Sequence, residues 1–262
     1  MYPRTAWYLV TVALMAAPPC SAQTRGGPPD TVDVKVGSTL VDFSAHRPTA
    51  QRAISTMTMN GQSRAMPPVV WTFSFDDSGG EPRLLVASRS EGAAQAGATP
   101  APPPVVFVFD RKSLALRQVL ADDGSVMLTV DGLSVRGKSP APGGASQPLD
   151  LTLTEPAFLR SLVDLVAESL PRRTGVVYRL PLWGFSSGTV EHRLYQFVRQ
   201  EDVEVLGRSY PKAWVLEDRS ADGTLMGTMW LVDRPPELVR WIINAPDGRT
   251  VQLEQEPADP SS

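Results

Sequence analysis

Most of the chain alternates apolar and polar residues with a period of two, which is typical of β-strands that bury one face. Short turns such as Asp131-Gly132 and Asp247-Gly248 separate these stretches and favour antiparallel pairing between neighbours. Strands are predicted at residues 69–76, 83–88, 105–111, 114–120, 126–130, 133–136, 176–183, 189–199, 203–206, 213–219, 225–232, 238–244 and 250–254. Few helices separate the strands, so the pattern argues against a parallel α/β sheet.

Residues 154–170 have a different period, because apolar side chains recur there every three or four positions, as in an amphipathic helix. The apolar positions are Phe158, Leu159, Leu162, Val163, Val166 and Leu170. The opposite, polar side carries Arg160, Asp164 and Glu168. Thr154 is a candidate N-cap, and Pro171 ends the segment. The pattern predicts one main helix whose apolar face covers a sheet.

The N-terminus, residues 1–22, has the features of a secretory signal peptide. A positive residue, Arg4, precedes an apolar stretch that is too short to span a membrane. Cys20-Ser21-Ala22 approximates a small-x-small cleavage site. We therefore expect cleavage after Ala22 and export to the periplasm or outer envelope in soluble form. Acylation of Cys20 is the alternative, although Pro19 stands where lipoprotein signals have a small residue.

The composition restricts the class of protein. The 262 residues include 25 Lys and Arg against 28 Asp and Glu, a net charge of −3, so the chain lacks the basic surface that binds nucleic acid. Cys20 is the only cysteine, which excludes a disulfide framework. Past the signal sequence, no apolar stretch is long enough for a transmembrane helix.

The organisation of the chain follows from its Gly-, Ala- and Pro-rich stretches. Residues 91–104 and 139–148 contain no large apolar cluster and are expected to be flexible loops. Residues 23–30 read as a flexible leader, and 257–262 as a polar tail. Residues 31–256 are expected to form a single β-rich domain.

Residues 132–139 (GLSVRGKS) match the spacing of a phosphate-binding loop, GxxxxGK[ST]. Such a loop needs a helix whose N-terminus faces the phosphates. Pro140, Pro142 and Pro148 follow instead. The interpretation we favour is a turn, a short strand and a loop.

Residues 184–188 (GFSSG) match GxSxG and make Ser186 a candidate nucleophile. A nucleophile elbow needs a following helix and a later His. A strand-like stretch follows here, and no histidine lies beyond His192. A triad in another chain order stays open. A secreted serine hydrolase using Ser186 is therefore the least favoured function, and no catalytic residue is predicted.

Metal and acid–base chemistry find little support. Two distant histidines and no cysteine in the mature chain leave no metal site, and no cofactor is expected. Glu191, Glu217 and Asp218 lie on predicted strands, where the pattern favours a solvated sheet face over a catalytic pair.

Four tryptophans fall on strands expected to be neighbours. These are Trp183, Trp214, Trp230 and Trp241. They either pack a core or line a concave site for an apolar ligand, and they are the candidate ligand-binding residues.

Several pieces between residues 105 and 255 carry a resemblance. They are residues 109–114 (FDRKSL), 130–135 (VDGLSV), 170–175 (LPRRTG), 203–207 (VEVLG) with 213–217 (AWVLE), and 227–233 (GTMWLVD) with 238–240 (LVR). This stretch resembles an exported bacterial family of unknown function that is related to the lipoprotein-sorting carriers. The resemblance implies an antiparallel half-open β-barrel, a curved meander sheet capped by the helix at 154–170. It also implies that the concave sheet shelters acyl chains or other apolar ligands.

Two functions follow as expectations. The first is a non-enzymatic envelope protein that binds a hydrophobic small molecule or lipid. The second is a structural or adaptor protein of the envelope with a filled core and a protein partner. Neither involves nucleic acid or a transmembrane span in the mature chain.

Overall fold

The computed structural model describes residues 30–43, 46–91, 104–140, 146–185, 189–233 and 236–258. In these ranges seventeen strands form one sheet: β1 (Asp30–Asp33), β2 (Thr49–Met59), β3 (Gln62–Ala65), β4 (Val69–Asp76), β5 (Arg83–Ser90), β6 (Val105–Asp110), β7 (Leu116–Ala121), β8 (Met127–Asp131), β9 (Ser134–Pro140), β10 (Ser146–Thr152), β11 (Phe158–Leu159), β12 (Val176–Trp183), β13 (Glu191–Val205), β14 (Arg208–Ser220), β15 (Leu225–Asp233), β16 (Pro236–Asn244) and β17 (Thr250–Pro257). The described ranges contain one α-helix, α1 (Val163–Ser169), after a 3-10 turn at Arg160–Leu162. No described helix has the length and apolar character needed to cross a membrane.

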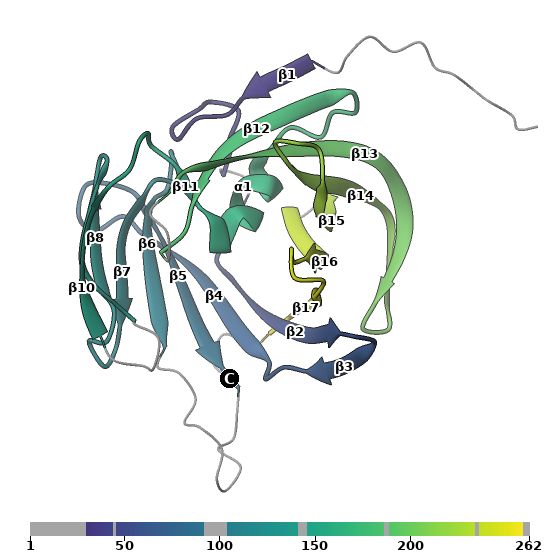
Figure 1. Ribbon diagram of the computed structural model, residues 1–262, viewed down its shortest axis with the longest axis horizontal. Coiled ribbons are helices and arrows are strands. Elements are labelled where there is room, and N and C mark those ends of the chain that lie inside the picture. The colour runs from purple at the N-terminus through teal and green to yellow at the C-terminus, as the bar shows by residue number, and fades with distance from the viewer. Residues whose placement is uncertain are drawn as a thin grey trace, which may run out of the picture.

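The order of strands in the sheet largely follows the chain. From β12 to β17 each strand pairs antiparallel with the next. β17 then pairs with β2, and antiparallel pairing continues from β2 through β4 to β10, with β3 as a short hairpin partner of β2. β1 and β11 run parallel to β12. The sheet is open and curves around α1 (Figure 1). The half-open antiparallel barrel with one helix is therefore confirmed.

The predicted helix is wrong over its first half. Phe158 and Leu159 form β11 and pair in parallel with Leu182 and Trp183 of β12. Thr154 is not an N-cap, because the helix begins after Leu162 and has no side-chain cap. Phe158 and Leu159 are 1% and 2% exposed, so both consecutive side chains are buried. A helix on a protein surface buries one stripe of its side chains. In an extended segment consecutive side chains point to opposite faces, so both are buried where both faces are covered.

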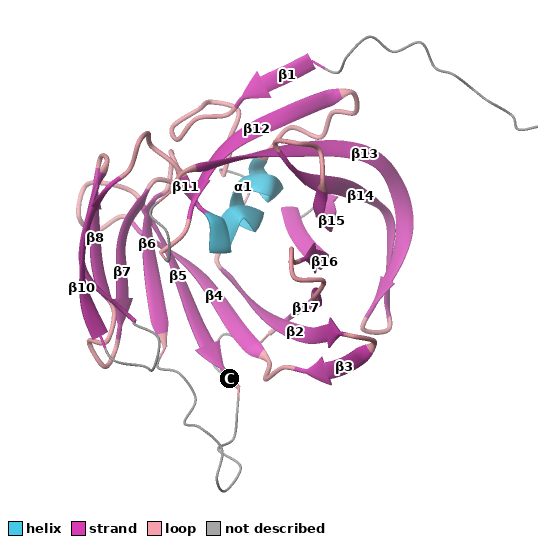
Figure 2. Ribbon diagram, in the orientation of Figure 1, coloured by secondary structure: helices cyan, strands magenta, loops and turns pink. Residues whose placement is uncertain are grey.

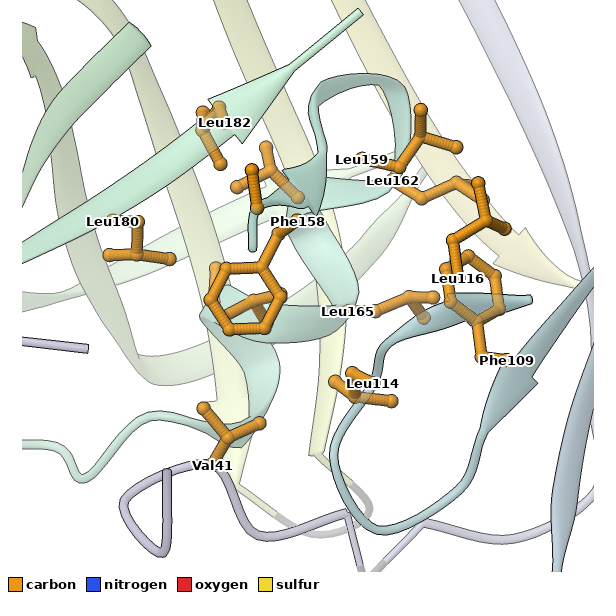
Figure 3. Close-up of a cluster of buried hydrophobic side chains, with 14 of the residues drawn as sticks. Val41, Phe109, Leu114, Leu116, Phe158, Leu159, Leu162, Leu165, Leu180 and Leu182 are labelled. Carbon is orange, nitrogen blue, oxygen red and sulfur yellow. The ribbon is translucent and has the colours of Figure 1, made fainter. Parts of the chain in front are cut away.

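The core lies between α1 and the inner face of the sheet. α1 stands within the curved wall of strands (Figure 2). Its Val163, Leu165, Val166 and Ala167 are all at most 2% exposed. Figure 3 shows side chains from the turn before β7, from β11 and from β12 meeting around Leu165. One cluster thus joins the helix to distant parts of the sheet.

A second, smaller cluster lies on the face of β13–β16 that points away from α1. It consists of Val203, Val205, Ala213, Val215, Trp230 and Val239. Register shifts in the β13–β14 pairing, between Phe197 and Arg199 and between Glu201 and Val203, change the twist of this long hairpin. The end of the hairpin thereby packs against β15 and β16.

Some strands and loop ends differ from the sequence prediction. The pattern predicts no strand for β1, β2, β3 or β10. In β2 the buried positions include Gln51 while Met59 is 48% exposed, so simple apolar alternation does not reveal the strand. The predicted loop at 139–148 is too long, because Pro140 pairs with Ser146 and Ser139 with Gln147. Residues 1–29, 92–103, 141–145 and 259–262 lie outside the described residues, with the predicted signal peptide, Cys20 and most of both loops.

Residues 132–139, which match the spacing of a phosphate-binding loop, form the turn after β8 and most of β9, as the preferred interpretation predicted. Gly132 sits in the turn before β9 with a φ of 57°, and Gly137 lies within β9 with a φ of 141°. A Cβ on Gly137 would lie 1.8 Å from the carbonyl oxygen of Met127 on the paired strand. The glycine is needed for close approach of β8 and β9, not for a phosphate.

Candidate functional site

A cavity of about 370 Å³ lies between α1, the segment before β2, the start of β2, the middle of β4 and the start of β16. Its apolar side is formed by Phe43, Pro48, Phe73 and Leu165. Its polar side is formed by His46, Arg47, Thr49, Gln51, Glu168 and Glu237. The volume is within the range of small-molecule sites, and apolar walls with a few convergent polar groups are typical of them.

The polar end is built on a buried His–Glu pair. Nε2 of His46 lies 3.2 Å from Oε2 of Glu168, and the two side chains are 8% and 6% exposed. Oε1 of Glu168 accepts a hydrogen bond from the backbone N–H of Leu238 at 2.8 Å. The His46 ring stacks on Phe43, with centroids 3.7 Å apart. These contacts fix the carboxylate of Glu168 between α1, β16 and the segment before β2.

Two further carboxyl groups lie near Glu168. Burial raises the pKa of Glu237, and the negative charge of Glu168 raises it further. Burial, again with Glu168, raises the pKa of Asp164 to about 7. Oδ1 of Asp164 is buried and has no hydrogen-bond partner among the described residues. The cavity end of α1 is therefore a region where negative charge is only partly balanced.

Arg172 holds the C-terminal end of α1 in place. Its guanidinium donates to the backbone oxygens of Ala167, Glu168 and Leu170, at 2.8 to 2.9 Å. A cation at these carbonyls also complements the partial negative charge of the helix end. The position of Glu168 thus depends on packing, on His46 and on this cap.

The predicted tryptophan site is divided between two faces of the sheet. Trp214 and Trp241 pack against the core cluster on the α1 side. Trp230 belongs to the cluster on the opposite face, where its Nε1 donates to Glu201 at 2.7 Å. Trp183 is fully buried beside a smaller cavity of about 230 Å³. The four do not meet around one cavity, and ligand binding by any of them stays a prediction.

The remaining sequence candidates do not converge on a reactive centre in the described residues. Ser186 lies outside these residues. His192 pairs with Glu155 at 3.2 Å, far along the chain from the His46 pair. No group of three His, Cys, Asp or Glu side chains that could hold a metal ion occurs in the described part of the chain.

Asp218 is not on a solvated sheet face, so that expectation is wrong for this residue. It is 4% exposed and forms a two-point ion pair with Arg193, at 3.0 Å from Nε and 2.8 Å from Nη2. Burial raises the pKa of Asp218 to about 6, and Arg193 acts in the opposite direction. The pairing of β13 with β14 places Arg193 and Asp218 side by side on the buried face of the sheet. Strand alternation alone does not show which face is buried.

Sequence reasoning missed the cavity and its polar end. The helical period places Asp164 and Glu168 on a solvated side, yet Glu168 is 8% exposed. α1 lies inside a curved sheet, so its second face is covered too. The sequence offers one weak signal, a histidine and an arginine followed by proline at 46–48 beside Phe43, and nothing in it connects this segment to Glu168.

Comparison with solved structures finds similar chains. A β-barrel-like protein of the domain of unknown function DUF1849 from Brucella abortus is 14% identical with a TM-score of 0.42, over 81% of this chain and 99% of that chain. A DUF1329 family protein from Desulfovibrio piger ATCC 29098 is 8% identical with a TM-score of 0.28, over 82% and 85% of the two chains. A LolA superfamily protein from Nitrosomonas europaea is 12% identical with a TM-score of 0.28, over 85% and 92%.

One of the three is named for the LolA superfamily, and the other two are named for domains of unknown function. No family model and no curated protein matches the sequence. At such identities and TM-scores the similar structures assign no ligand and no functional residue to this chain, so function has to be argued from its own geometry.

Proposed function

We propose that the protein is a non-enzymatic, exported binding protein for an apolar small molecule or lipid, and that the cavity beside α1 holds part of this ligand. The observation that carries the proposal is the cavity itself. Phe43, Phe73 and Leu165 supply an apolar wall, and the buried pair of His46 and Glu168 supplies a fixed polar end. Such a combination favours a ligand with an apolar body and one polar group.

Export is the second part of the proposal. It is supported by the signal-like residues 1–22, with a positive start, an apolar stretch and a small-residue cleavage site. In an exporting host, the secreted protein is expected to begin at Gln23, which N-terminal sequencing or intact mass would establish. A product carrying acyl chains on Cys20 would contradict cleavage after Ala22.

Binding is tested by filling the cavity. Thr49 and Phe73 are directly opposite each other on β2 and β4 and both line the cavity. Thr49→Trp places a large side chain there, so we expect at least a tenfold weaker affinity for an environment-sensitive apolar dye. Thr72→Trp is the matched control, because Thr72 pairs with Ala50 in the same strands and points to the other face. Equal affinities in both variants would contradict this location of the site.

The filled part of the core supports an alternative function, that of a structural or adaptor protein. The cluster around α1 leaves little space near Leu162 and Phe158, which are 4% and 1% exposed. A structural or adaptor protein needs such a core and no ligand. It would bind a protein partner, and it would show no saturable dye binding in the wild-type protein.

A further inference from the structure

The polar end of the cavity presents mainly hydrogen-bond acceptors. In the neutral tautomer of His46 that donates from Nε2 to Glu168 across the 3.2 Å contact, Nδ1 is left as a lone-pair acceptor. His46 is 7% exposed and lines the cavity, and among the described residues its Nδ1 has no hydrogen-bond partner. A buried acceptor without a donor is unfavourable, so this position favours a ligand that donates.

Glu237 adds a carboxylate that no described side chain pairs with. It lines the same cavity as Glu168 and His46. Among the described residues, no hydrogen bond or ion pair reaches its side chain, in contrast to Glu254, which pairs with Arg240 at 2.6 Å. Burial and the negative charge of Glu168 raise the pKa of Glu237, and the positive charge of Arg208 offsets this rise only in part.

Among the described residues that line the cavity, Arg47 is the one permanently charged cation. Arg47 donates from Nη1 to the backbone oxygen of His46 at 2.9 Å, which directs part of its guanidinium at its own chain. Gln51 can donate or accept and adds no charge. In the described part of the cavity wall, two carboxylates and the His46 imidazole therefore stand against one arginine.

We propose that the cavity selects ligands in which an apolar chain ends in a cationic, hydrogen-bond-donating head such as a primary ammonium, with Glu237 as its counter-ion. This inference rests on the proposed function and specifies the class of its ligand. The ammonium supplies donors for the acceptors at the polar end, and its charge offsets that of Glu237 in a poorly hydrated site, where an ion pair is stronger than at the surface. Phe73 and Leu165 contact the chain.

Three probes with the same chain and different heads test the inference: decylammonium, decanol and decyl sulfate. Each displaces the apolar dye from the full chain at pH 7.5, below its critical micelle concentration. We expect decylammonium to bind at least tenfold more tightly than decyl sulfate, with decanol between them. Equal affinities, or tighter binding of the sulfate, would overturn the charge selectivity and leave apolar binding intact. Failure of all three probes, and of the dye, would overturn the proposed function as well.

The counter-ion is tested with Glu237→Gln, which keeps the shape and removes the charge. We expect the preference for decylammonium over decyl sulfate to fall at least fivefold, while the affinity for decanol changes less than twofold. Glu204→Gln is the control, because Glu204 is an exposed glutamate on β13 and does not line the cavity. An unchanged preference in Glu237→Gln would overturn the role of Glu237, and the comparison of heads in the wild-type protein does not depend on this variant.

Discussion

The carboxyl group of Asp164 makes the stability of the fold depend on pH in a direction that can be tested. Its pKa is raised from 3.8 to about 7 in the folded protein, first by burial and then by Glu168 one helical turn away. A carboxyl group with a raised pKa binds its proton more tightly when folded than when unfolded. Its contribution to stability is therefore complete below about pH 4 and is lost as the pH rises to about 7.

The magnitude follows from the size of the shift. At about 1.4 kcal/mol per pKa unit, a rise from 3.8 to about 7 corresponds to about 4 kcal/mol, of which about 3 kcal/mol is lost between pH 5 and pH 8. Asp164→Asn removes the titration. Urea unfolding of both proteins at pH 5 and pH 8 gives the free energy of unfolding at each pH. Every other ionisable group is common to both chains, so the difference between the two pH dependences reports Asp164 together with its coupling to Glu168.

We expect Asp164→Asn to lose less stability than the wild type on going from pH 5 to pH 8, by up to about 3 kcal/mol. A constant offset between the two proteins is compatible with this expectation, because it does not change with pH. Asp150→Asn is the control, since the side chain of Asp150 is 76% exposed. Parallel pH dependences for the wild type and Asp164→Asn would refute the raised pKa of this carboxyl group.

Three further substitutions test other parts of the fold. Leu162→Asp places a charge at a position that is 4% exposed and is expected to abolish soluble expression; unchanged melting would contradict the packing of the segment before α1. Gly137→Ala brings a Cβ to 1.8 Å from the oxygen of Met127, and we expect a loss of at least about 2 kcal/mol by urea unfolding, whereas a neutral effect would argue against the β8–β9 register. Arg193→Ala leaves Asp218 buried without its partner and is expected to cost about 3–5 kcal/mol at pH 8 and less at pH 5; a loss independent of pH would exclude the charge as its cause.

Strand periodicity predicted most of the sheet because one-sided burial leaves a direct record in the sequence. The segments at 83–88 and 189–199 alternate as a half-buried strand should: Leu84 and Val86 are buried on β5, and Tyr195 and Phe197 are buried on β13. The same reasoning failed where both sides of a segment are covered. Phe158 and Leu159 read as a helical stripe, yet they form β11 at the inner edge of the sheet.

The candidate site was less predictable than the fold. Glu168 reads as a solvated helix residue, and His46 lies 122 positions away from it in the chain, so local patterns cannot reveal their 3.2 Å contact. The tryptophans could be assigned to neighbouring strands. Their division between two faces depends on the register, in which Trp230 pairs with Val215 and Trp241 with Met229.

The central claim is that the protein carries an apolar ligand, and native mass spectrometry of the protein from an exporting host tests it most directly. The full chain with its leader is expressed, purified without detergent and measured before and after organic extraction. We expect an additional mass that is released on denaturation and identified in the extract as a molecule with an apolar chain. A bare polypeptide mass that stays unchanged after incubation with envelope lipids would contradict the claim and favour the adaptor.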